Sequence, residues 1–163
     1  MNVTSGIQSK MRSCVRGRLL GSVLAASAAC IASMPTTATE FTQAPDDAKA
    51  WIVSPQDGDT VPTRFKVVFG LTDFGIAPAG VEVANTGHHH LLLDTELADY
   101  SQPIPADAQH RHFGKGQTEV ELELLPGPHT LQLVLGDYLH RPHNPPVQSQ
   151  RITINVSEQT DAQ

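Results

Sequence analysis

The sequence predicts an all-β fold, a single antiparallel β-sandwich of the immunoglobulin-like type. Apolar and polar residues alternate with a period of two in several short segments. These segments are separated by turn signals rich in proline and glycine. No segment keeps a period of 3.6 residues over the length of a long helix. Short strands at this spacing are typical of a sandwich, and a small β-barrel is the alternative fold.

The expected strands follow one another along the chain. In RFKVVFGL (64–71) every second residue is large and apolar, and in EVELEL (119–124) apolar residues alternate with glutamates. HTLQLVLGD (129–137) and RITINV (151–156) repeat the alternation. NTGHHHLLLD (85–94) has the leucine run of a buried strand, preceded by three histidines. The turn signals between the strands are SPQDGDTVP (54–62), APAG (77–80), LPGPH (125–129) and PHNPP (142–146).

The N-terminus has the pattern of a secretory signal. Residues 1–18 carry four basic side chains and no acidic one, and residues 19–32 are apolar or small. An apolar segment of this length is too short to cross a bilayer core of about 30 Å, so we expect cleavage after Ala38 and no stable membrane anchor. A start at Met11 and lipidation of Cys30 are the alternatives.

This pattern divides the chain into four parts. We expect a signal peptide over 1–38, a polar N-terminal tail over 39–50, the β-sandwich domain over 51–157 and a C-terminal tail over 158–163. The mature chain has the size of one domain with one packed core. The expected location is the periplasm or the exterior of the cell.

The composition of the mature chain excludes several kinds of chemistry. Both cysteines and all three methionines precede residue 39, so no disulfide, thiol nucleophile or thioether copper site is expected. Removing the four basic residues of the leader leaves seven of the 11 Lys+Arg against all 17 Asp+Glu, a formal net charge of −10. A chain this acidic has no basic patch for nucleic acid and attracts cations.

All eight histidines lie between positions 88 and 143. Residues i and i+2 of a strand project from one face, with Cβ atoms close enough for two imidazoles to reach one ion. Imidazole nitrogen suits Cu(II) and Zn(II), so we expect such an ion as cofactor and as binding partner. The candidate ligands form three closely spaced pairs: His88 and His90, His110 and His112, His140 and His143.

Further polar residues are expected to support this site or the fold. Asp94, Asp107 and Asp137 are candidates to complete the site or to orient its ligands by hydrogen bonds. His89 and His129 share the parity of core leucines, which indicates structural roles. The same structural interpretation stays open for the paired histidines, since histidine often fastens a loop without binding a metal.

Catalysis is the second class of function that we considered. The His-x-His pair, Asp94 and the later His129 have a loose similarity to cupin metal motifs, but their spacing differs from that pattern. No serine lies in a G-x-S-x-G context. We therefore expect no catalytic residue and no enzymatic activity.

The chain resembles the DUF4399 family of small exported bacterial domains of unassigned function. The resemblance covers about residues 51–156 and is carried in order by NTGHHHLL, H-x-HFG-x-GQTE, PG-x-HTLQLV-x-GD and H-x-PH-x-PP. It implies an exported domain bearing these histidines and carries over no catalytic residue. The sequence thus predicts a domain that binds Cu(II) or Zn(II) for storage, delivery or sensing. A structural or protein-interaction domain of the cell envelope is the alternative.

Overall fold

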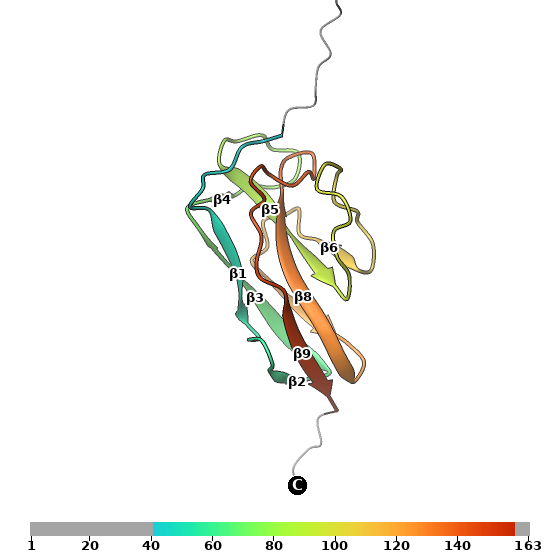
Figure 1. Cartoon of the computed structure of the whole chain (residues 1–163). Helices are drawn as coiled ribbons and strands as arrows, with labels where there is room; N and C mark the ends of the chain where they lie inside the picture. The colour runs from blue at the N-terminus through green and yellow to red at the C-terminus, as the bar shows by residue number, and fades with distance from the viewer. Residues whose placement is uncertain (1–40, 159–163) are drawn as a thin grey trace, which may run out of the picture. The chain divides into compact units, whose positions relative to one another are not determined.

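The computed structural model describes residues 41–158, which form an all-β sandwich of two sheets (Figure 1). The expected signal peptide and nearly all of the expected C-terminal tail lie outside the described residues. The smaller sheet has the order β1-β3-β7 and the larger one β2-β9-β8-β5-β4, with β6 also paired to β5. The strand bounds are β1 Lys49–Ser54, β2 Thr60–Pro62, β3 Arg64–Thr72, β4 Gly75–Ile76, β5 Thr86–Leu93, β6 His110–His112, β7 Glu119–Glu123, β8 Gly127–Gly136 and β9 Ile152–Ser157.

The strand pairing confirms the predicted sandwich. The long pairs β1–β3, β3–β7, β5–β8 and β8–β9 are all antiparallel. The short pairs β2–β9 and β4–β5 are parallel, a detail that the alternation of residues does not reveal. Residues 41–158 contain no helix with the length and hydrophobicity that crossing a membrane requires.

The core lies between the two sheets and follows the predicted parity. Phe65, Val67 and Phe69 of β3 are buried, whereas Lys66 between them is exposed. Across the core, alternate residues of the larger sheet face them, because successive side chains of a strand point to opposite faces. The buried residues of this cluster are Ile52, Phe65, Val67, Phe69, Leu91, Leu93, Phe113, Leu122, Leu131, Leu133, Ile154 and Val156.

Strand β5 is buried on both faces, and this burial positions the candidate site. From Gly87 to Leu93 every residue is buried. Leu91 and Leu93 face the core between the sheets, whereas Leu92 packs on the outer face with Leu97 and Ile104. The β5–β6 connection therefore forms a second layer over the outer face of β5. His88 and His90 share the parity of Leu92 and are fully buried.

The segment before β1 is part of the domain, which differs from the expected polar tail over 39–50. Strand β1 begins at Lys49, and Ala44 is buried. Thr42 Oγ1 donates a hydrogen bond of 2.7 Å to Asp137 Oδ2, and the Ala44 N–H donates to the Asn144 carbonyl at 3.3 Å. The polar composition of this segment suggested a tail, but its polar groups bond to the loop after β8.

Candidate metal centre

Two histidines of β5 form the buried base of the candidate site. His88 and His90 are each 0 % exposed. They project from the same face of the strand, as their spacing predicts, and their Nε2 atoms lie 3.1 Å apart. Their ring centroids are 4.9 Å apart. The strand pairs on both edges, with β8 and with β6, so these two imidazoles have a fixed backbone.

The third histidine comes from β6. His112 lies directly opposite His90 in the antiparallel β5–β6 pair, which puts both side chains on one face. Its ring centroid is 5.1 Å from that of His90 and 5.0 Å from that of His88. Each of the three residues offers a ring nitrogen, and these atoms all lie within 4.8 Å of one another. Unlike the other two, His112 is exposed to solvent.

His140 approaches the same three rings from the turn that follows β8. Its ring centroid is 4.8 Å from that of His112, 5.0 Å from that of His88 and 6.0 Å from that of His90. Its backbone has a positive φ of 67°, and its N–H donates to the Asp137 carbonyl at 2.8 Å. The tight turn therefore carries the fourth imidazole over the end of the sheet.

Two glycines lack side chains where the rings of His90 and His112 lie. An ideal Cβ atom at Gly136 would lie 2.9 Å from His90 Nε2, and one at Gly114 would overlap the ring of His112. A real Cβ atom does not approach another atom so closely. The two-residue period of the strands does not mark these glycines. The signal that could have identified them is their place in the chain, since Gly136 is the last residue of β8, in LGD, and Gly114 follows the end of β6 by two residues, in HFG.

Burial keeps the imidazoles of His88 and His90 neutral at physiological pH. It lowers the pKa of His88 to about 4, helped by the neighbouring His140 and His112 and partly offset by Asp137. Burial likewise lowers the pKa of His90 to about 2, with further lowering from His88 and His112. The pKa of His112 is lowered by burial and by His140. Neutral imidazole carries the free lone pair that metal binding requires.

Some nitrogen atoms of the cluster have no hydrogen-bond partner among the described residues. These are the Nδ1 atoms of His88 and His90, both fully buried. A buried polar group without a partner costs roughly 1–3 kcal/mol, and few such groups occur in folded proteins. An ion held by the facing Nε2 atoms of His88 and His90 would not contact these Nδ1 atoms, so their burial does not by itself point to a metal.

Asp137 organises the turn that carries His140. Its buried carboxylate accepts hydrogen bonds from Thr42 Oγ1, from the N–H groups of Leu139 and Arg141, and from the Arg141 guanidinium at 3.2 Å. Burial raises the pKa of this carboxyl, but the hydrogen bonds outweigh that effect and leave the pKa below its ordinary value. Asp137 is thus an ionised group beside the cluster, and its charge acts on His88.

Comparison with known proteins assigns the family. Residues 67–157 match the model of a family described as "Domain of unknown function (DUF4399)". The chain belongs to the DUF4399 family. The matched segment contains the four clustered histidines and Asp137, and it agrees with the resemblance read from the sequence.

Two further comparisons add little to this assignment. No curated protein sequence matches the DUF4399 chain. Among solved structures it is similar to the fibronectin(III)-like modules of Clostridium thermocellum CbhA, with 11 % identity and a TM-score of 0.34. The match covers 68 % of this chain and 46 % of that chain, so the DUF4399 chain spans less than half of the matched structure.

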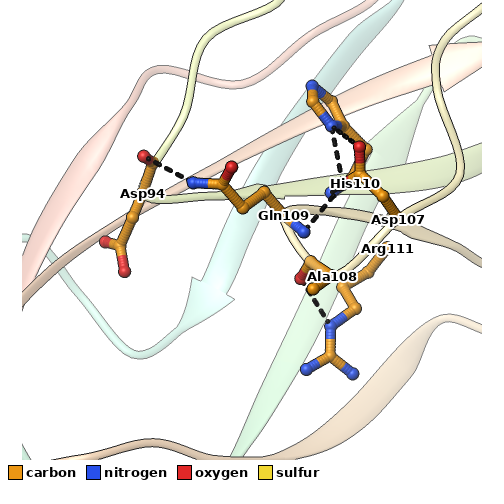
Figure 2. Close-up of polar contacts among 6 residues, drawn as sticks. All are labelled: Asp94, Asp107, Ala108, Gln109, His110 and Arg111. Carbon is orange, nitrogen blue, oxygen red and sulfur yellow. Dashed lines mark hydrogen bonds and ion pairs between the residues drawn. The ribbon is translucent and has the colours of Figure 1, made fainter.

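His110 of the DUF4399 domain does not join the other rings, although the sequence paired it with His112. It lies opposite Leu92, two positions along β5 from His90. Its Nδ1 atom is 2.9 Å from Asp107 Oδ1, which also accepts the His110 N–H (Figure 2). Hydrogen bonding to His110 lowers the pKa of Asp107. Asp107 therefore fastens this loop instead of orienting a clustered ligand.

Asp94 and His129 lie at the other end of β5, away from the cluster. Asp94 follows the strand, and its carboxylate contacts His129 Nδ1 at 2.7 Å and the Thr130 N–H at 2.7 Å. His129 Nε2 is 2.9 Å from the Leu125 carbonyl oxygen. The structure thus separates Asp94 from the site that it was expected to support. His129 makes contacts of the structural kind that we expected, although it is only partly buried.

His143 and His89 are buried next to the site without entering the group of rings. His143 packs edge-on against Phe74, with centroids 4.9 Å apart. Burial lowers its pKa, and the charge of Asp137 only partly offsets this effect. His89 points into the core, where its ring lies 4.9 Å from that of Phe69. The fold therefore separates His143 from its expected partner His140 and gives His89 the core position that parity predicts.

Proposed function

We propose that this DUF4399 domain binds one divalent transition metal ion, Cu(II) or Zn(II), at the site formed by His88, His90 and His112. The observation that carries the proposal is the convergence of three ring nitrogens within 4.8 Å of one another. Tetrahedral coordination at 2.0–2.1 Å would separate ligand nitrogens by about 3.3 Å. The His88 and His90 Nε2 atoms, 3.1 Å apart, are already close to that spacing.

The donor set favours these metals over others. Imidazole suits Zn and Cu, whereas Mg and Ca take oxygen ligands. No carboxylate belongs to the convergent group of ligand atoms in the described part of the chain. The three ligands also differ in solvent exposure, since two are buried on β5 and one is exposed on β6. An ion held in this way is retained by the sheet and reached from solvent, which suits storage, delivery or sensing outside the cytoplasm.

Metal titration of the exported, processed protein tests the proposal. We expect isothermal titration calorimetry at pH 7.5 to give a dissociation constant tighter than about micromolar, near −8 kcal/mol, for Cu(II) or Zn(II). The double variant His88→Ala/His90→Ala is expected to lose this binding. His110→Ala is the matched control, because His110 lies on the same short strand as His112 but bonds to Asp107. Its affinity should equal that of the wild type.

The alternative function is a structural or interaction domain. The contact between His88 Nε2 and His90 Nε2 favours it, since two neutral imidazoles 3.1 Å apart can share a hydrogen bond. Elemental analysis of protein purified from the periplasm without an affinity tag separates the two functions. Absence of copper and zinc, together with no uptake in the titration, would leave the histidines structural.

A further inference from the structure

We infer that the ion at this site keeps an open coordination position for a small anion, and that His140 hydrogen-bonds this anion instead of ligating the metal. The inference rests on the proposed function and deepens it, because it assigns a class of ligand to the bound metal. It is carried by the geometry around His140, by the side from which solvent reaches the site, and by the charge that the site would hold.

The number of protein ligands points to an open coordination position. Three histidines place their ring nitrogens within 4.8 Å of one another, and His140 does not belong to that group. Its ring nevertheless faces all three, at centroid distances of 4.8 to 6.0 Å. Three protein ligands with a fourth position left for water or another molecule are typical of reactive zinc sites, whereas closed structural sites use four.

Hydrogen bonds within and across its turn hold the backbone of His140 in place. Its N–H donates to the Asp137 carbonyl at 2.8 Å, and its carbonyl accepts the Ile104 N–H at 2.7 Å. The Asp137 carboxylate closes the same turn through the N–H groups of Leu139 and Arg141. Moving the backbone of His140 toward the ion would break these bonds, so at its present position the ring is better placed to contact a molecule bound to the metal.

Solvent reaches the site from one side. His88 and His90 are fully buried, whereas His112 is exposed and His140 is partly exposed. The open position therefore faces the side where His112 and His140 lie. A small molecule can reach the ion there without any movement of β5.

The loaded site would carry positive charge. A divalent ion held by neutral imidazoles keeps its full charge of two in a partly buried site. Asp137 offsets little of this charge, because its carboxylate is already paired with Arg141 at 3.2 Å. Burying an uncompensated charge is costly, so an anion such as hydroxide, chloride or azide at the open position would stabilise the loaded site.

The test uses azide as the probe anion on the Cu(II)-loaded, processed protein. We expect a new azide-to-copper charge-transfer band and a changed electron paramagnetic resonance spectrum. His140→Asn and His140→Gly are the variants, since both residues tolerate the positive φ of this position. We expect each variant to weaken azide binding about tenfold or more, as loss of a hydrogen bond to a charged ligand does. Cu(II) affinity should stay within about threefold of the wild type, a change of less than 1 kcal/mol.

Each other outcome is informative. Spectra unchanged by azide would show a closed site and overturn the inference while the proposed metal binding stands. Loss of Cu(II) affinity by about a hundredfold in both variants would make His140 a fourth ligand, which also overturns it. Variants that bind azide as the wild type does would remove the role of His140. Failure of the wild type to bind Cu(II) would instead refute the proposed function itself. His110→Ala is the control and should match the wild type in both titrations.

Discussion

Gly136 on β8 lies directly opposite His88 on β5, and the position that a side chain of Gly136 would take is occupied by the ring of His90. An ideal Cβ atom there would be 2.9 Å from His90 Nε2 and 3.3 Å from the backbone of His140. Strand β8 therefore supports the site and, at Gly136, leaves the space that the His90 ring fills.

Gly136→Ala is expected to weaken metal binding by about tenfold or more, because the added methyl group displaces the His90 ring from the convergent set. Overpacking of a buried strand should also lower the free energy of unfolding by about 1–3 kcal/mol. Calorimetric titration with Zn(II) and chemical denaturation measure the two effects.

Gly70→Ala is the control for this prediction. A Cβ atom at Gly70, on the other sheet, would overlap the Trp51 ring. This variant should lose stability without losing metal affinity. Equal loss of affinity in both variants would indicate that general destabilisation, and not the position of His90, controls binding.

The segment before β1 is expected to contribute to stability through Thr42. Thr42→Val removes the hydroxyl that donates to the buried Asp137 carboxylate, which should lower the free energy of unfolding by about 1–3 kcal/mol. Gln43→Ala, an exposed neighbour, should change it by no more than about 0.5 kcal/mol. Urea denaturation of both variants measures the difference. Similar small changes in the free energy of unfolding of both variants would indicate that the segment before β1 is a tail that does not stabilise the domain.

The His129–Asp94 pair is expected to make stability depend on pH. Burial lowers the pKa of His129, but hydrogen bonds to Asp94 and the Leu125 carbonyl outweigh it, so the folded pKa is raised above 6.5. The folded state then binds the proton more tightly than the unfolded chain. The resulting stabilisation is complete below pH 6.5 and is lost as pH rises through the raised pKa.

Asp94→Asn provides the measurement. Asparagine tolerates the positive φ of this position and still accepts the Thr130 N–H, but it removes the charge beside His129. The stability difference between wild type and Asp94→Asn should therefore be larger at about pH 6 than at about pH 8.5. A difference that does not change between these two pH values would contradict the raised pKa. Metal affinity at pH 7.5 should be unaffected, because the pair lies at the far end of β5.

The half-buried β7 strand is expected to respond by parity. Leu122 is 2 % exposed and packs in the core, so Leu122→Ala should cost about 2–5 kcal/mol of unfolding free energy. Glu121 is exposed and its oxygen lies 3.8 Å from Arg64 Nε, so Glu121→Gln should cost less than about 1 kcal/mol. Thermal or urea denaturation distinguishes them. Equal costs at the two positions would refute the assignment of faces.

The sequence by itself determined which residues face the core and that His88 and His90 share a face. Both follow from the two-residue period of a strand, which is a local property. The buried leucines of β8 and the alternation of β7 therefore appear in the structure as predicted. Motifs in the sequence also indicated the DUF4399 family before the fold was known, and the family model confirms it.

Only the tertiary structure decided which histidines meet. His110 and His112 are equivalent by spacing, and the register of β6 on β5 sets His112 opposite His90 and His110 opposite Leu92. His140 and His143 are also near in sequence, yet the Asp137 turn directs the first to the cluster and leaves the second against Phe74. Register and turn closure depend on hydrogen bonds between segments far apart in the chain, such as Thr42 to Asp137, and local periodicity carries no information about such contacts.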